Sequence, residues 1–87
     1  MIYSKDSQSR VGLFFREARI SSGLSQKRLS EILGYTTPQL VSNWERGECV
    51  IPAKAMRIMT RELGLSKNKV IKFLLEESSK SIRSVIK

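Results

Sequence analysis

Histidine is absent from this sequence of 87 residues, and cysteine occurs once, at Cys49. The usual general base of enzymes and the usual nitrogen ligand of metals are therefore both missing. A single cysteine also excludes an internal disulfide and a four-thiolate zinc site, and it fits a reducing cytoplasm. Because no carboxylate cluster could hold two metals either, we predict no enzyme, no metal site and no cofactor.

Long apolar runs are missing as well, since no stretch approaches the roughly 20 residues that span a bilayer. The first ten residues, MIYSKDSQSR, have no apolar centre, so a cleaved secretion signal is not expected. Hydrophobic residues make up 40% of the chain, which is enough for one core, and we predict a single domain over residues 1–87. No membrane association, small-molecule ligand or sensor domain is apparent.

Acidic residues are scarce. Eight Asp and Glu stand against sixteen Lys and Arg, which gives a formal net charge of +8. A surplus of this size in a small domain favours a polyanionic partner, either nucleic acid or an anionic membrane surface. The alternative is a basic protein whose charges are only solvated.

The chain has only two prolines and no strand-like alternation, so we predict an all-α fold. Glycines divide it into five helices of about 8 to 14 residues. The predicted helices cover about 8–22, 25–34, 37–46 and 52–64, and a fifth opens at Ser66. Ser25 and Thr37 are the expected N-caps of the second and third helices, and Pro38 is the expected first residue of the third.

Apolar residues at helical spacing predict the inward face of each helix. In chain order these residues are Val11, Phe15 and Ala18; Leu29, Ile32 and Leu33; Leu40, Val41 and Trp44; Ala55, Met56, Met59 and Leu63; and Val70, Ile71, Leu74 and Leu75. Leu13 and Phe14 lie beside the first stripe and are candidates for a protein interface. The alternative is that the chain's own tail covers them.

The tail over residues 76–87 supports two interpretations. Ile82, Val85 and Ile86 are spaced by three and four residues, which favours a helical extension with its own apolar stripe. The serines of this segment favour fraying. We expect a partly helical tail that is ordered by a partner chain, with Glu76 and Glu77 in a polar stretch.

The segment TTPQLVSNWERG, residues 36–47, has the clearest functional pattern. If Thr37 caps the helix, Gln39 and Asn43 are four residues apart and share one face, opposite the apolar residues. Each of these amides can bond bidentately to adenine in the major groove. Two short helices joined by GYT also fit the helix-turn-helix description, although many helical domains contain such pairs.

Taken together, these motifs resemble the Cro and phage-repressor type of helix-turn-helix protein, the family of xenobiotic-response-element-like regulators. The resemblance covers about residues 9–75. It is carried by GLSQKRLSEILGY, by VSNWERG, and by the proline five positions beyond Gly47. The flanking segments VGLFFREARISSG and RELGLS also match the family's framework.

The resemblance implies a role for individual residues. Thr37, Gln39, Leu40 and Asn43 match positions that face the DNA groove, and Gln26 matches a glutamine that contacts phosphate. Arg19 and Glu45 match a pair that forms an internal salt bridge, and Trp44 matches the large apolar anchor of the recognition helix. We also assign phosphate contacts to Arg10, Lys27, Arg46 and Lys54, which lie near helix ends expected at the DNA surface, and to Thr36, whose short side chain can approach phosphate.

The sequence departs from the family pattern at the turn. Gly34 is followed by Tyr35, Thr36 and Thr37, so the turn is one residue longer than usual, and Pro38 replaces a polar residue. Whether Thr36 or Thr37 meets the DNA backbone stays open. Leu40 could meet thymine methyl groups or pack inside the molecule.

These features predict a sequence-specific regulator of transcription, acting as a repressor, that binds duplex DNA as a homodimer on a pseudo-palindromic operator. We expect a cytoplasmic protein, bacterial or phage-encoded, that is associated with the nucleoid. The alternative function is a protein-interaction module with the same fold, such as an antitoxin or a coregulator. Cys49 is either a redox switch or, more simply, an incidental free thiol.

Overall fold

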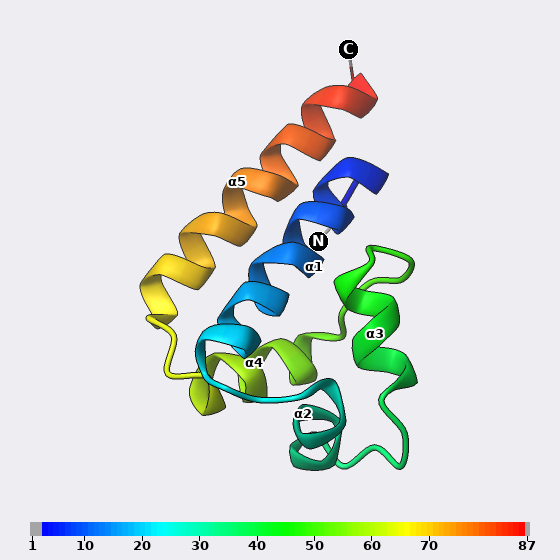
Figure 1. The fold of residues 1–87 in the computed structure, drawn as a ribbon. Coiled ribbons are helices and arrows are strands. Elements are labelled where there is room, and N and C mark those ends of the chain that lie inside the picture. Colours follow the sequence, from blue (N-terminus) through cyan, green and yellow to red (C-terminus); the bar gives the residue numbers. More distant parts are fainter. Residues whose placement is uncertain (1–2, 87) are drawn as a thin grey trace.

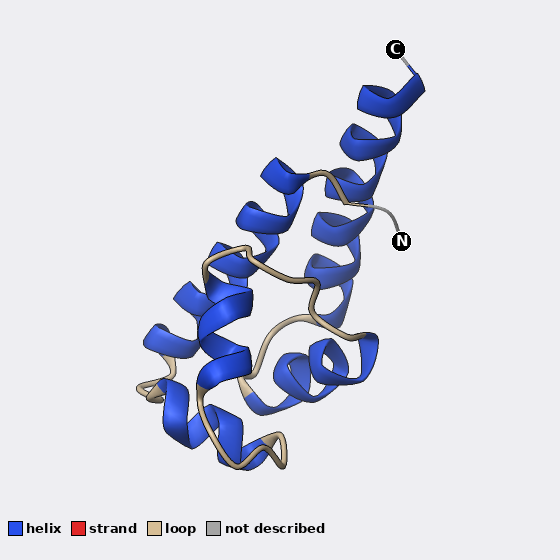
Figure 2. Cartoon of the chain, turned by 90° about the vertical axis from the view of Figure 1, so that its right-hand side faces the viewer, coloured by secondary structure: helices blue, strands red, loops and turns tan. Residues whose placement is uncertain are grey.

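The computed structural model describes residues 3–86 and contains five helices. They are α1 (Lys5–Ser21), α2 (Gln26–Ile32), α3 (Gln39–Glu45), α4 (Ala53–Glu62) and α5 (Lys67–Ile86). α1 and α5 lie side by side and antiparallel, and α2 and α4 lie near the end of this pair opposite to the termini (Figure 1). In the second view, as in the first, the last turns of α5 project past the start of α1 (Figure 2). The all-α, five-helix prediction is confirmed.

All five helices contribute to one apolar core. Its buried members are Val11, Phe15, Leu29, Val41, Trp44, Ile51, Ala55, Met56, Met59, Leu63, Val70 and Leu74. Most of the predicted inward residues are therefore buried. The prediction is wrong for Leu40, Ile71 and Leu75, whose side chains are 41%, 44% and 60% exposed. α5 faces the core with Val70 and Leu74, which turns the adjacent flank of the helix outward.

Two helix starts differ from the prediction. α1 begins at Lys5 rather than near residue 8, because the Oγ of Ser4 accepts the backbone N–H of Ser7 at 3.1 Å and caps the helix. α3 begins at Gln39, with Pro38 rather than Thr37 at the cap position. The Pro38 carbonyl accepts the first helical hydrogen bond, from Ser42 at 3.0 Å. Thr37 still contributes, since its Oγ1 accepts the N–H of Gln39 at 3.4 Å.

The C-terminal tail is helical through Ile86, and the polar stretch EESSKS lies inside the helix. Of this stretch, Glu77, Ser78 and Ser81 are buried, so it was wrong to expect only solvated polar residues there. The chain itself orders the tail as far as Ser81, whose Oγ accepts the backbone N–H of Ser4 at 2.8 Å. Beyond that contact, Ile82, Val85 and Ile86 are exposed.

The two interface candidates on α1 differ in their surroundings. Leu13 is exposed. Phe14 is half-buried, because its ring stacks on that of Phe73 in α5 with a centroid distance of 4.5 Å. α5 thus covers Phe14 and leaves Leu13 open. Within residues 3–86, no helix is both long enough and apolar enough to cross a membrane.

Candidate nucleic-acid interface

α3 is anchored to the rest of the molecule through one buried face. Val41 and Trp44 are almost fully buried, and the Trp44 ring meets Tyr35 edge-on at 5.9 Å. The backbone of α1 approaches closely at Gly12, where an added Cβ would overlap the carbonyl oxygen of Trp44. The absence of a Cβ at Gly12 therefore allows α3 to lie this close to α1.

The end of α3 is held by a buried carboxylate. Arg19 donates to Glu45 twice, from Nε to Oε2 at 2.6 Å and from Nη2 to Oε1 at 3.0 Å. Gln26 at the start of α2 donates its Nε2 to the same Oε1 at 2.9 Å. Arg19 also donates to the carbonyl of Leu24 at 2.7 Å. The ion pair that the resemblance implied is present, and it joins α1, α2 and α3 around Glu45.

The opposite face of α3 carries a connected row of polar side chains. Gln39 donates its Nε2 to the Oδ1 of Asn43 at 2.9 Å, and Arg46 donates its Nη2 to the same oxygen at 2.8 Å. The guanidinium also bonds to Ser42 and to both carboxylate oxygens of Glu48, at 3.1 and 3.2 Å. The hydrogen bond from Arg46, and then its charge, lower the pKa of Glu48.

The remaining positions assigned to the DNA face are open to solvent. Leu40 is 41% exposed and does not belong to the core, which excludes the interpretation that it packs inside the molecule. Thr36 and Thr37 are both exposed in the segment before α3. The structure therefore brings Thr37, Gln39 and Leu40 together at the start of one helix.

The residues assigned to phosphate fall into two groups. Lys27 and Lys54 are exposed near the starts of α2 and α4, and neither takes part in a salt bridge among the described residues. The others are already bonded within the molecule. Arg10 pairs with Glu77, Arg46 pairs with Glu48, and Gln26 bonds to Glu45.

Glu77 was missed as a structural residue. Its side chain is only 4% exposed, and its Oε1 accepts from the Nε of Arg10 at 2.8 Å and from Ser7 at 3.0 Å. Lys80 donates to the other carboxylate oxygen at 3.3 Å. Burial raises the pKa of Glu77, but the hydrogen bonds from Arg10, Ser7 and Lys80 outweigh it and hold that pKa below the ordinary value. No local pattern marks this role, because the donors come from both α1 and α5.

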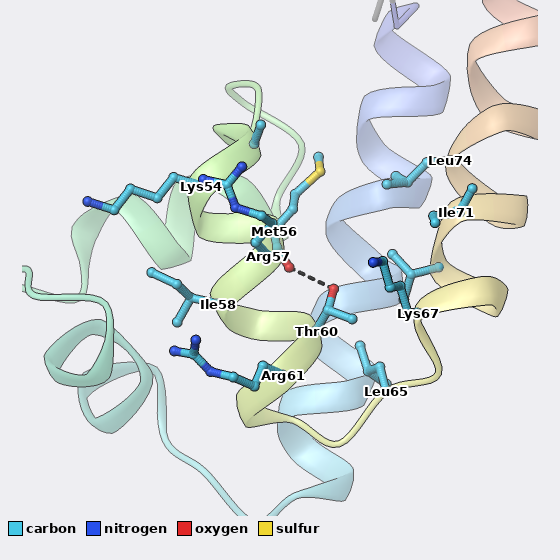
Figure 3. Close-up of a pocket in the computed structure, with 12 residues that line it drawn as sticks. Lys54, Met56, Arg57, Ile58, Thr60, Arg61, Leu65, Lys67, Ile71 and Leu74 are labelled. Carbon is cyan, nitrogen blue, oxygen red and sulfur yellow. Dashed lines mark hydrogen bonds between the residues drawn. The ribbon is translucent and has the colours of Figure 1, made fainter.

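A shallow groove of about 860 Å³ crosses the outer face of α4 and reaches the start of α5 (Figure 3). Figure 3 shows Leu65, Lys67, Ile71 and Leu74 on the α5 side of α4, and Lys54, Ile58 and Arg61 projecting from its other side. Its floor is largely apolar, and its charged lining residues are all basic. Its lining includes Lys54, one of the residues assigned to phosphate.

The family model HTH_3, described as helix-turn-helix, matches residues 15–70, which is more than half of the chain. The chain belongs to the helix-turn-helix family. Membership confirms the resemblance to the Cro and phage-repressor type and makes this a DNA-binding domain. It also agrees with the prediction that the chain is not an enzyme. No curated protein sequence matches the chain.

Solved structures share the fold at low sequence identity. Two crystal structures of the clp gene regulator ClgR from Corynebacterium glutamicum each match with a TM-score of 0.67 and 21% identity. They cover 82% and 92% of this chain, and 90% and 81% of their own. A mutant of the restriction-modification controller protein C.Esp1396I matches with a TM-score of 0.67 and 20% identity, covering 91% of this chain and 98% of its own. These similarities show a common architecture.

Proposed function

We propose that this protein is a sequence-specific regulator of transcription that places α3 in the major groove of duplex DNA and acts as a repressor. The observation that carries the proposal is the joined pair of Gln39 and Asn43 on the exposed face of α3. Val41 and Trp44 bury the opposite face, so the pair is presented in a fixed orientation. Carboxamides on such a helix suit the donor and acceptor that adenine offers in the major groove.

In this arrangement α2 crosses the DNA backbone while α3 reads base edges. Lys27 and Lys54 supply phosphate contacts, together with Thr36 and the free part of the Gln26 amide. Thr37 and Leu40 flank the amide pair, and the exposed methyl groups of Leu40 suit the methyl group of thymine. For Arg10 and Arg46 we favour the intramolecular roles given by their bonded partners. The protein, bacterial or phage-encoded, would then act in the cytoplasm in association with the nucleoid.

The proposed operator-binding form is a homodimer that pairs through α5. Ile71, Leu75, Ile82 and Ile86 are exposed, and their spacing of four, seven and four residues places them on one face of this helix. Exposed apolar residues on one face suit a second helix of the same type, although Ser78 and Ser79 separate Leu75 from Ile82. Two-fold pairing would present the two copies of α3 to half-sites about one DNA turn (~34 Å) apart.

The structural neighbours carry the names of a gene regulator and of a controller protein, which supports a regulatory role. The test begins with duplexes selected from a random pool by the wild-type protein and proceeds to fluorescence anisotropy on selected and scrambled duplexes. Gln39→Ala is expected to lose about 1–3 kcal/mol of discrimination between the two. Lys27→Ala, the matched control, is expected to weaken binding to both duplexes similarly and to reduce the salt dependence.

Two outcomes would contradict the proposal. Unchanged selectivity in Gln39→Ala would remove the assigned base contact. DNA binding that does not fall as salt rises would favour the protein-interaction module, because phosphate contacts release counterions and make affinity steeply salt-dependent.

A further inference from the structure

Glu48 lies outside α3, yet its position is fixed by the end of that helix. Gly47 has a φ of +73°, a conformation that glycine adopts without strain, and it turns the chain back across the helix end. The backbone N–H of Glu48 then donates to the carbonyl of Asn43 at 2.9 Å. The turn therefore brings the Glu48 carboxylate to the side chain of Arg46, where both of its oxygens accept hydrogen bonds.

The contacts of Arg46 determine how the Asn43 amide is turned. A guanidinium has only donors, so the Asn43 atom 2.8 Å from Nη2 must be the oxygen. Gln39 reaches the same oxygen, so it must present its own NH₂ group there, at 2.9 Å. Among the described residues, no side chain bonds to the NH₂ group of Asn43 or to the side-chain carbonyl oxygen of Gln39, so these two groups are left available to DNA.

We propose that Glu48 is a specificity-determining positioning residue, which acts through Arg46 to fix the donor and acceptor order that Gln39 and Asn43 present to DNA. This inference rests on the proposed function and deepens it. The acceptor on Gln39 and the donor on Asn43 complement the amino group and N7 of adenine. Guanine offers two acceptors at the same edge, so it does not match this order. We call the contacts from Glu48 through Arg46 to Asn43 and Gln39 the relay. Without the relay, each amide can rotate and present either its NH₂ group or its oxygen.

The relay has an electrostatic consequence. A carboxylate at the DNA surface repels phosphate, so removing it raises the affinity for any duplex. Loss of the fixed amide order lowers the preference for the selected sequence. Glu48→Ala is therefore expected to bind scrambled duplex more tightly and to discriminate less. A residue that only stabilised the fold would weaken both kinds of binding together.

The experiment uses the selected and scrambled duplexes and measures the ratio of their dissociation constants. Glu48→Ala is expected to reduce that ratio about fivefold to tenfold. Glu62→Ala is the matched control, because Glu62 is an exposed acid paired with Arg61 at 3.3 Å on α4. It removes the same charge and is expected to leave the ratio unchanged.

Arg46→Lys tests the relay at its middle residue. Lysine keeps the charge but has one nitrogen in place of the planar fork, so it cannot reproduce the separate bonds that Nε and Nη2 of Arg46 make to Glu48 and Asn43. The expected loss is similar to that of Glu48→Ala, and the double variant is expected to lose no more than either single variant. In the free protein, the side-chain amide NMR signals of Gln39 and Asn43 are expected to shift in Glu48→Ala and to stay in place in Glu62→Ala.

The outcomes separate the two proposals. A wild-type protein that selects no common sequence would overturn the proposed function and the relay with it. A wild-type protein that selects a sequence, together with Glu48→Ala that retains the full ratio, would overturn the relay alone. A reduced ratio with raised affinity for scrambled duplex supports both.

Discussion

α1 packs against its two main neighbours by different means. Toward α3, the contact is a close backbone approach at Gly12, beside the buried ion pair of Arg19 and Glu45. Toward the C-terminal half of α5, the contact is a hydrogen-bonded cluster around Glu77, Ser7 and Ser81. The first junction combines a close fit of the two backbones with a buried ion pair. The second is a hydrogen-bonded cluster around a carboxylate whose pKa is lowered, so it responds to pH.

Gly12→Ala is expected to give the largest effect, because the new Cβ would overlap the carbonyl oxygen of Trp44 and force α1 and α3 apart. We expect a loss of about 4 kcal/mol or more in the free energy of unfolding, measured by urea denaturation. Gly64→Ala is the control, since that Cβ meets open space and the cost is only about 1 kcal/mol for a left-handed alanine. Equal losses in the two variants would contradict the close approach.

Glu45→Gln tests the charged part of the same junction. Both side chains of the Arg19–Glu45 pair are at most 10% exposed, so the change leaves a buried guanidinium without its counter-charge. We expect a loss of about 3 kcal/mol by chemical denaturation. Glu31→Gln, which breaks an exposed pair with Arg28, is expected to cost less than about 0.5 kcal/mol. A similar cost at both sites would show that burial of the pair contributes nothing.

Glu77→Gln tests the polar junction and its dependence on pH. Near neutral pH we expect a loss of about 2 kcal/mol, because hydrogen bonds to a charged acceptor are replaced by weaker ones. The folded pKa of Glu77 is depressed, so its contribution is present above the ordinary carboxyl pKa and is lost as pH falls through the folded value. Urea denaturation of both proteins from pH 7 to pH 3 should show the difference shrinking below about pH 5.

The control for this experiment is Glu76→Gln, which removes a charge from an exposed neighbour on the same helix. It is expected to be nearly neutral for stability. If the difference in the free energy of unfolding between the wild type and Glu77→Gln stays constant down to pH 3, the assigned role of the carboxylate is contradicted.

Ser30→Ala is expected to give the smallest effect, with the opposite sign. The Oγ of Ser30 is buried in α2 and has no hydrogen-bond partner among the described residues. Removing it should stabilise the protein by about 0.5–1 kcal/mol, seen as a higher midpoint of thermal unfolding. Ser7→Ala removes a buried hydroxyl that does have partners, and it should destabilise by a similar amount. The same sign in both variants would contradict this distinction.

Much of the fold follows from local signals. Ser25 does cap α2, and the spacing of Ala55, Met56, Met59 and Leu63 marked the buried face of α4. The start of α1 was placed too late because Asp6 and Ser7 carry no apolar signal, although Ser4 is an N-cap residue that could have been noticed. The buried side of α5 was placed wrongly because four apolar residues, Val70, Ile71, Leu74 and Leu75, span more of the helix than one neighbour can cover.

Some features of the candidate site also follow from local sequence signals, and others depend on the fold. Spacing alone placed Gln39 and Asn43 on one face, because residues four apart are neighbours on any α-helix. It could not show that Arg46 and Glu48 extend this row, since that depends on how Gly47 turns the chain. It also left open the side that Leu40 serves, which depends on how α3 is rotated against α1.

The sequence by itself determined the all-α class, the order of the helices and the polar face of α3, because periodicity, caps and glycines act within a few residues of each other. Only the tertiary structure decided which charges are paired and which apolar residues stay exposed. Arg10 and Glu77 are 67 positions apart, and no local pattern connects them. Such pairs affect stability because a buried charge without a partner is costly, and the partner can come from any part of the chain that the fold brings near.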